Sequence, residues 1–376
     1  MKIVLIGPVY PYRGGIAHFT TLLGFALQAN HDLKVVSFRR QYPRWLYPGR
    51  TDRDPSRQSI SIQAEYLLDP LKPWTWVQTG TWIRDFSPHV VVIQWWTTFW
   101  ALPLGVLCRM LVRKGLPVVY IAHNVLPHES HAWDKALALF ALRAGSAFIV
   151  MTETQRTLLN HLMPGKRVAV VPHPDSTGLA KTDTTREQAR MELGLPKQAR
   201  IALFFGFVRP YKRLGDLIEA IGLLHHRGQE VFLLVAGEFW EPEGKYDRQV
   251  HRLGLEKSVR FYNRYIPNEE IAPLFHAADV CIVPHLPGIQ SGVAALARSF
   301  GLPIVTTRGE DVPRGSTLGV FLAEAKDSDS LAGAIALALS TPPTRKQMAE
   351  AIEEEWDKLA HVIETLARHQ NEDLDT

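Results

Sequence analysis

The chain has 376 residues, of which 46% are hydrophobic and 21% are charged, close to the averages of soluble globular proteins. This composition excludes a disordered, collagen-like or low-complexity chain, and the length suggests two domains. Two cysteines are too few for a disulfide scaffold or a cysteine-rich zinc site, which favours a reducing compartment. The charge is uneven: 19 basic and 9 acidic residues up to Val170 give a net +10, whereas the remainder, with 23 and 29, gives −6.

Short apolar runs alternate with longer helical patterns along the chain. The runs are continuous, which is typical of parallel strands that are buried on both faces. Residues 213–227 and 327–340 have the length and pattern of helices between such strands. The alternation occurs twice, and it predicts two doubly wound, Rossmann-like α/β domains. The predicted strands are 2–7, 34–38, 90–94, 118–123, 147–152, 168–172, 201–206, 231–237, 259–263, 280–284 and 303–307.

The pattern also predicts where one domain ends and the next begins. Residues 173–199 are polar and turn-rich, and are predicted to link an N-terminal domain of 1–172 to a C-terminal domain of 200–344. Apolar residues at helical spacing predict a helix in the segment 345–376. No run of 18 apolar residues occurs, so we expect no membrane-spanning helix. The apolar run at 3–7 is too short for the core of a signal peptide.

Ligands of open parallel sheets bind beyond the carboxyl ends of the strands, so the residues that follow each strand are the candidates. In the first half, Gly14 and Gly15 precede a predicted helix, where backbone amides can approach an anion closely; an ordinary strand–helix turn is the alternative. His123 ends another strand, and His128 lies on the loop that follows it. A histidine here can donate to a sugar hydroxyl or stabilise a leaving phosphate, or it can simply be structural.

In the second half, cations follow a predicted strand. Arg209 and Lys212 lie on a loop between a buried strand and a helix, a placement that suits a diphosphate. Further along, Ser291 and Gly292 open an apolar helix whose first amides form another candidate anion site. The alternative for Ser291 is a simple helix cap.

Residues 39–57 contain six arginines together with tyrosine and tryptophan, a mixture that suits an anionic membrane surface. A solvated arginine-rich loop is the alternative. No DNA- or RNA-binding motif is present, so we expect no nucleic-acid partner. Asp52 and Asp54 form a D-x-D pair, but they lie in this basic loop and not at a strand end. Because no spacing of metal ligands occurs either, we expect no metal.

Eight stretches of the chain, in this order, resemble the family-four retaining glycosyltransferases of the GT-B fold, and most closely the bacterial branch that builds lipid-linked or extracellular polysaccharides. The resemblance covers nearly the whole chain. It implies two domains that face each other across a cleft, a nucleotide sugar on the C-terminal domain, an acceptor on the N-terminal domain, and a C-terminal helix that crosses back to the first domain. The stretches are GPVYPYRGGIAHF, SFRRQYPRWLYPGRT, VVIQWWTTFW, AHNVLPHE, LFFGFVRPYKRL, VAGEFW, NRYIPNEEI and QSGVAALARSFGLPIV.

The resemblance also implies roles for single residues. It makes His123, Arg209 and Lys212 the catalytic group, with the two cations on the donor diphosphate and His123 near the donor sugar. Implied donor-binding residues are Gly15, Arg209, Lys212, Tyr265, Ile266, Gln290, Ser291 and Gly292, and implied acceptor-binding residues are Gly14, His18 and His128. The chain departs from the family where two glutamates, spaced E-x7-E, are common. Gln290 and Arg298 occupy those positions, which leaves ribose recognition without a residue.

We therefore expect a retaining glycosyltransferase that needs no metal and works at the cytoplasmic face of the cell membrane as a peripheral protein. It would move a sugar from a nucleoside diphosphate sugar to a hydroxyl of a lipid-linked glycan. The missing glutamates leave two alternatives open: a sugar-nucleotide epimerase on the same fold, and a non-catalytic subunit that binds sugars or nucleotides.

Overall fold

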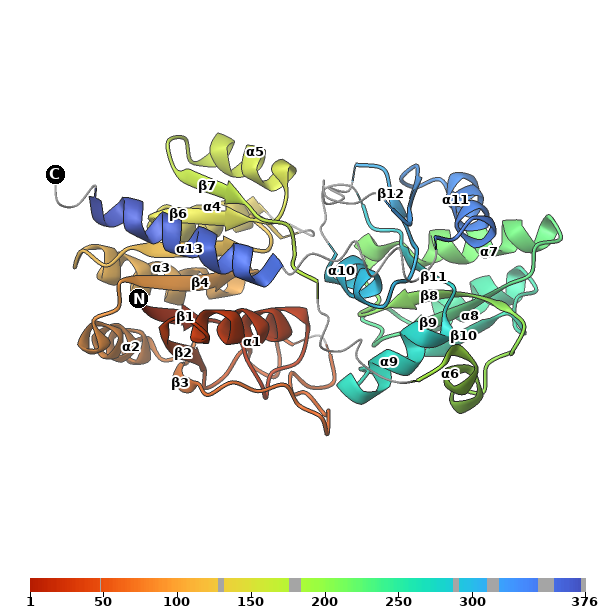
Figure 1. Ribbon diagram of the computed structural model, residues 1–376, viewed down its shortest axis with the longest axis horizontal. Helices are drawn as coiled ribbons and strands as arrows, with labels where there is room; N and C mark the ends of the chain where they lie inside the picture. The colour runs from red at the N-terminus through yellow and green to blue at the C-terminus, as the bar shows by residue number, and fades with distance from the viewer. Residues whose placement is uncertain are drawn as a thin grey trace. The chain divides into compact units, whose positions relative to one another are not determined.

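The computed structural model describes residues 1–47, 49–127, 132–175, 184–286, 291–309, 318–343 and 355–372. The chain divides into two compact units (Figure 1). Unit 1 comprises residues 1–54, 59–172 and 354–376, and unit 2 comprises residues 55–58 and 173–353.

Unit 1 is built on a sheet of seven parallel strands in the order β3-β2-β1-β4-β5-β6-β7. The chain first winds outward from β1 to β3 and then returns to the other side of β1, so β1 and β4 flank the switch point where ligands of such sheets bind. The strands are β1 (Lys2–Ile6), β2 (Asp32–Phe38), β3 (Glu65–Leu68), β4 (Val90–Trp95), β5 (Val118–Ala122), β6 (Ala147–Val150) and β7 (Arg167–Val170). The helices are α1 (Gly15–Gln28), α2 (Pro73–Phe86), η1 (Thr98–Trp100), α3 (Ala101–Val112), α4 (Ala132–Leu142), α5 (Glu153–Leu162) and α13 (Glu355–Glu372).

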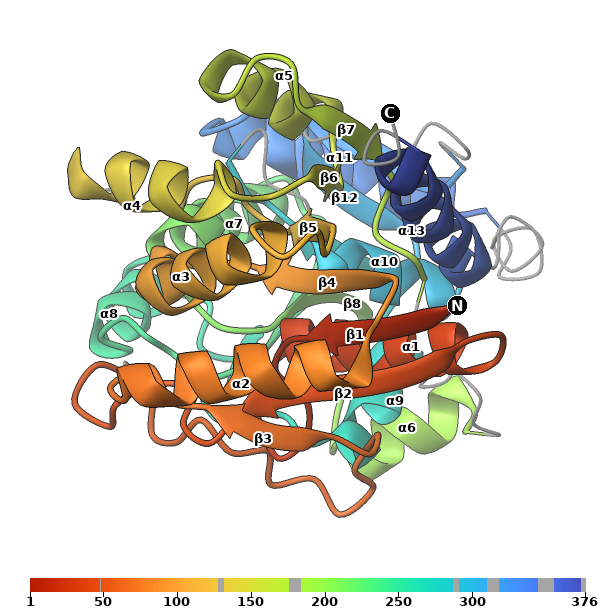
Figure 2. The same cartoon turned by 90° about the vertical axis from the view of Figure 1, so that its left-hand side faces the viewer.

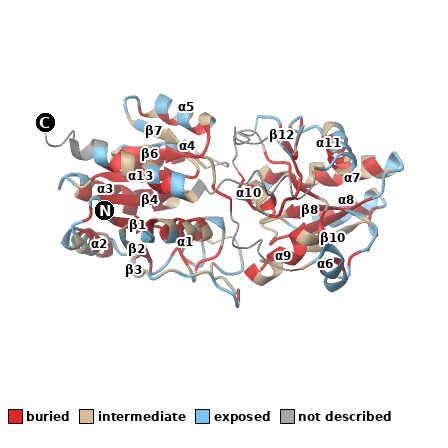
Figure 3. Ribbon diagram, in the orientation of Figure 1, coloured by how far each residue is buried: buried red, intermediate tan, exposed pale blue. Residues whose placement is uncertain are grey.

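Helices cover both faces of this sheet. Along β1, Ile3 and Leu5 pack into a cluster with α1 and α13, whereas Val4 and Ile6 pack into a second cluster with α2 and α3. Figure 2 shows α2 and α3 side by side on their face of the sheet, and Figure 3 shows the buried strands between the two helical layers. The alternation of side chains along each strand supplies both cores, which explains the continuous apolar runs.

Unit 2 repeats the plan with six parallel strands in the order β10-β9-β8-β11-β12-β13, so β8 and β11 flank its switch point. The strands are β8 (Arg200–Phe205), β9 (Val231–Ala236), β10 (Val259–Tyr262), β11 (Val280–Val283), β12 (Ile304–Thr307) and β13 (Val320–Ala323). The helices are α6 (Arg186–Glu192), η3 (Pro210–Lys212), α7 (Leu214–His226), α8 (Gly244–Arg252), α9 (Asn268–Ala277), α10 (Gly292–Ser299) and α11 (Ser328–Ser340).

The expected fold class, two doubly wound α/β domains, is confirmed, and every predicted strand is present. The prediction missed β3 and β13, each at one edge of its sheet, because each strand has only four residues, of which one is buried. Within the described residues, no helix is long and apolar enough to cross a bilayer.

Part of the predicted linker 173–199, the segment Arg186–Glu192, forms helix α6 of unit 2. Helix α6 begins with a capping box between Thr185 and Gln188, and it buries Arg190 against α9. Arg190 donates to the carbonyl of Ala277 at 3.0 Å and pairs with Asp279 at 2.7 Å. The polar composition concealed the helix because one of its two buried residues, Arg190, is a cation that Asp279 neutralises.

Candidate functional site

The loop after β8 in unit 2 approaches the end of β9 very closely. A Cβ atom on Gly237, which follows β9, would stand 2.0 Å from the carbonyl oxygen of Gly206, so only glycine fits there. A Cβ atom on Gly206 would lie 3.0 Å from Lys212 Nζ and 3.7 Å from Val293 Cγ2. The ammonium group of Lys212 therefore lies at the switch point, with the end of β8 and the first turn of α10 both beside it.

Lys212 is a buried cation. Its residue is 7% exposed, and within the described residues no carboxylate lies within 4.0 Å of its ammonium group. Burial, together with the charge of Arg209, lowers the pKa of Lys212 to about 8, although Cys281 opposes the shift. Two cations on one loop at a switch point favour an anion with more than one charge. The structure thus brings together Arg209 and Lys212, as the sequence predicted.

Aromatic rings surround Arg209. Its guanidinium lies 5.2 Å from the ring centroid of Trp240 and 5.3 Å from that of Tyr211. Phe207 stacks on Trp240 with centroids 4.6 Å apart, and Tyr265 lies 6.3 Å from Phe207. These rings come from the ends of three neighbouring strands and offer a surface on which a planar base can stack. The sequence prediction did not include Trp240, although it shortly follows β9 and so satisfies the same strand-end rule.

The other predicted donor-binding residues have mixed placements. Ile266 is 4% exposed and packs in an apolar core cluster of unit 2, which leaves its backbone for any ligand contact. The hydroxyl of Ser291 accepts the N–H of Val293 at 3.2 Å, so Ser291 is the cap of α10. Gly292 is exposed at the start of that helix. Gln290 lies outside the described residues.

A neutral histidine supports the start of α10. Burial lowers the pKa of His173 to about 4, so its ring is uncharged at pH 7. A Cβ atom on Gly292 would stand 3.3 Å from Nε2 of that ring, so a larger residue at this helix start would crowd His173.

Arg298, where the family usually has its second glutamate, forms an ion pair. Its Nη2 lies 2.8 Å from Oδ1 of Asp175, and both side chains are largely buried. Burial raises the pKa of Asp175, and Arg298 opposes this shift. The pair attaches the chain after β7 to helix α10. Sequence reasoning missed Asp175 because nothing in its neighbourhood along the chain points to a partner 123 residues away.

In unit 1, the loop after β1 leads to a glycine pair. Gly14 has φ +105° and caps α1, and a Cβ atom on Gly15 would have no atom within 4 Å. His18, on the first turn of α1, has Nε2 3.7 Å from Oδ2 of Asp54. This nitrogen is buried and has no hydrogen-bond partner within the described part of the chain. The N-terminus of α1 therefore has space beside Gly15, and the ring of His18 contacts Asp54 without a hydrogen bond from Nε2 to any described residue.

His123 is held firmly at the end of β5. Its Nε2 lies 2.7 Å from Oε1 of Gln94, and its carbonyl accepts from Nε2 of Gln155 at 3.0 Å. Phe19 of α1 packs against the ring edge to face, with centroids 4.6 Å apart. The sequence prediction missed both glutamines, although Gln94 is near the end of a buried strand. His128 lies outside the described residues.

Among the described residues, no cluster of three or more His, Cys, Asp or Glu side chains is arranged to hold a metal ion. The positive charges at the unit 2 site are instead those of Arg209 and Lys212.

Two family models match consecutive parts of the chain. The one described as Glycosyltransferase Family 4 matches residues 13–174, and the one described as Glycosyl transferases group 1 matches residues 185–355. A D-inositol 3-phosphate glycosyltransferase of Corynebacterium glutamicum is 29% identical over 175 residues, which is 45% of this chain and 42% of that protein. The match thus spans about two fifths of the length of this relative.

Solved structures share the fold over the whole chain. Sucrose-phosphate synthase from Thermosynechococcus elongatus has a TM-score of 0.73 and 18% identity, with 98% of each chain covered. HepE from Anabaena, solved in complex with UDP and glucose, has a TM-score of 0.68 and 19% identity, with 100% of this chain and 99% of HepE covered. The two family models and the shared fold agree, and the chain belongs to the glycosyltransferases of the family-four type with the GT-B fold.

Proposed function

We propose that the protein transfers a sugar from a nucleoside diphosphate sugar to a hydroxyl group of a glycan, with retention of the anomeric configuration. The observation that carries the proposal is the buried ammonium of Lys212, which lies beside Gly206 and α10 with Arg209 on the same loop. A diphosphate supplies the negative charge that this loop lacks. The HepE structures, which hold UDP or UDP-glucose, support the donor class.

The proposed reaction breaks the bond between the sugar C1 and the diphosphate oxygen while the acceptor oxygen bonds to C1. The acceptor proton passes to the departing diphosphate, whose charge Arg209 and Lys212 stabilise. In this scheme His123 hydrogen-bonds the donor sugar, and its own orientation is fixed by Gln94. Because the two cations neutralise the diphosphate, we propose that no divalent metal is needed.

For the donor, we propose that the ring surface of Phe207, Trp240 and Tyr265 receives the base and that the exposed start of α10 at Gly292 faces a phosphate. For the acceptor, we propose the glycine pair of unit 1, with Nε2 of His18, which makes no hydrogen bond to a described residue, donating to or accepting from a hydroxyl. These roles assign the base and the diphosphate of the donor to unit 2 and the acceptor to unit 1.

We further propose that the acceptor is a lipid-linked glycan in polysaccharide biosynthesis and that the protein attaches reversibly to the inner face of the cell membrane. The support is the net +10 of residues 1–170 and the exposure of Arg44, Trp45 and Leu46. Not all arginines of 39–57 are available, since Arg39 donates to the carbonyl of Tyr66 and Arg40 lies 3.8 Å from Asp69.

The experiment measures binding and turnover of a panel of nucleotide sugars by the purified protein and its variants. Arg209→Ala and Lys212→Ala should each weaken nucleoside diphosphate binding and turnover about 10- to 150-fold, since a charge-assisted contact contributes about 1.5–3 kcal/mol. The matched control is Arg213→Asn, which removes a cation of the same loop that already pairs with Asp216 at 2.6 Å. It should leave binding nearly unchanged, and a chelator should not change turnover.

Four results would contradict the proposal. Unchanged affinity in both alanine variants would remove the diphosphate assignment. An epimerised nucleotide sugar would identify an epimerase, and binding without any turnover would identify a binding subunit. Activity lost with chelator and restored by magnesium or manganese would contradict the metal-independent scheme.

A further inference from the structure

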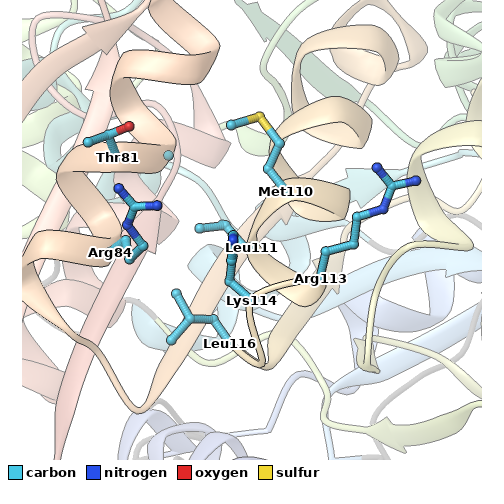
Figure 4. Close-up of a pocket in the computed structure, with 8 residues that line it drawn as sticks. Thr81, Arg84, Met110, Leu111, Arg113, Lys114 and Leu116 are labelled. Atoms are coloured by element: carbon cyan, nitrogen blue, oxygen red, sulfur yellow. The ribbon is translucent and has the colours of Figure 1, made fainter.

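A hollow of about 210 Å³ lies in unit 1 where the C-terminal halves of α2 and α3 meet. These helix ends lie at the edge of the sheet opposite to the carboxyl ends of the strands, so the hollow is separate from the candidate site. Figure 4 shows Thr81 and Arg84 on α2 opposite Met110, Leu111 and Lys114, whereas Arg113 extends away from Arg84. The lining combines an apolar floor with cations, which suits a ligand with a negative group and an apolar portion.

No acidic side chain of the described residues pairs with the cations of this hollow. Arg84, Arg113 and Lys114 are exposed, and no carboxylate among the described residues lies within 4.0 Å of any of them. Lys2 adds a further positive charge, because its Nζ lies 5.2 Å from the ring centroid of Phe86, the last residue of α2. Cations at a helix C-terminus also stabilise the helix itself, so charge alone does not decide the role.

A second observation concerns the exposed side of α2 next to the hollow. Trp74, Val77, Thr81 and Arg84 follow one another at intervals of three and four residues, so they share one side of α2. All four are exposed, Trp74 by 59% and Val77 by 50%. On α3, Leu102 is likewise 53% exposed. On this side of α2, the exposed apolar residues Trp74 and Val77 are followed by the cation Arg84, so the surface is amphipathic. Helices that lie in a membrane interface combine apolar and basic residues in this way.

We infer that this face of α2 and α3 rests on an anionic membrane, and that the hollow receives the phosphate of a phospholipid headgroup between Arg84 and Lys114. Trp74 and Val77 enter the interfacial region, and the apolar floor formed by Met110 and Leu111 contacts the glycerol portion. The inference shares the membrane location with the proposed function, but it places the main lipid contact on these helices and not on the loop 39–57. It does not depend on the transfer reaction.

The test uses the full chain and vesicles of phosphatidylcholine with or without roughly one third of phosphatidylglycerol, by co-sedimentation at low and physiological salt. Each basic residue at an anionic surface contributes about fivefold in partitioning, so Arg84→Gln with Lys114→Gln should lower binding roughly 25-fold. The matched control, Arg248→Gln with Lys257→Gln, removes two exposed charges from unit 2 and should leave binding unchanged. Trp74→Ala should weaken binding, whereas Met191→Ala, which alters an even more exposed apolar residue of unit 2, should not.

Several outcomes would overturn the inference. These are equal binding to neutral and anionic vesicles, an equal loss in the control pair, and a loss caused by Arg44→Gln with Trp45→Ala but not by the α2–α3 pair. Binding of a mixed-sequence RNA with the same dependence on Arg84 and Lys114 would identify a general polyanion site instead. Because Arg84 and Lys114 belong to unit 1 and the diphosphate loop belongs to unit 2, nucleotide affinity in the double variant should equal that of the parent. Failure of this inference is therefore distinguishable from failure of the proposed function.

Discussion

The ammonium group of Lys212 is buried in the loop after β8, and this burial changes its pKa. Its pKa falls from 10.5 to about 8, chiefly by burial. The value of 10.5 applies to the unfolded chain and the value of about 8 to the folded one. Between pH 8 and pH 10.5 the unfolded chain therefore binds more protons, so this group makes the ligand-free protein more stable as the pH rises through that range. At pH 7 the folded protein holds a charge that it stabilises poorly. A bound anion removes this cost, and it should return the pKa of Lys212 towards its usual range.

The affinity for UDP should therefore fall as the pH rises above about 8, because the free protein must then take up a proton to bind the diphosphate. The decline should approach, but not exceed, about tenfold per pH unit. Calorimetric titration in two buffers of different ionisation enthalpy measures this proton uptake directly. Lys212→Arg, which keeps its charge at every accessible pH, should bind with a nearly flat profile. Absence of proton uptake in the parent protein near pH 9 would show that Lys212 is not the diphosphate contact.

At the scale of elements, the sequence was most informative where burial is complete. All six residues of β4 are buried, so a continuous apolar run revealed this strand. The strands β3 and β13 were missed because each is short and has one buried residue, and α6 was missed because its polar residues acquire partners only in the folded chain. The same difference applies to the site. Arg209 and Lys212 were predictable from their place after a strand, whereas Asp175 matters through a contact that only the tertiary structure creates.

The ion pair between Asp175 and Arg298 should stabilise helix α10 in a way that depends on both partners. Arg298→Met leaves a buried carboxylate without its cation and should lower the free energy of unfolding by about 3–5 kcal/mol. Adding Asp175→Asn should restore much of this loss, since the buried charge is then gone as well. Chemical unfolding of the parent, the two single variants and the double variant measures the coupling.

Breaking an exposed ion pair provides the comparison for this double-mutant cycle. Arg252 and Glu219 form an ion pair whose side chains are 61% and 35% exposed, and Arg252→Met should cost no more than about 1 kcal/mol. Equal losses for Arg298→Met and Arg252→Met would mean that the buried pair contributes no more than a surface contact.

At the scale of the whole molecule, the two units have separate cores, but unit 1 is completed by a distant part of the chain. Leu359 and Ile363 of α13 are fully buried in the cluster that contains Leu5 of β1 and Phe19 of α1. The ring of Trp356 lies 5.1 Å from that of Phe19, which in turn packs against His123. Helix α13 thus supports the residue that we propose contacts the donor sugar, although more than 200 residues separate them in the sequence.

Truncation of one buried leucine of α13 should therefore destabilise unit 1 selectively. Leu359→Ala removes a fully buried side chain and should cost about 2–5 kcal/mol, depending on how far the cavity collapses. The same substitution at Leu337, which is 53% exposed on α11 of unit 2, should stay within about 0.5 kcal/mol. Hydrogen exchange measured by mass spectrometry locates the effect: amides of α1, β1 and β5 should exchange faster in Leu359→Ala, and those of β8 and β9 should not change. Equal acceleration in both units would show that they unfold as one cooperative body, and no acceleration would show that α13 contributes little to unit 1.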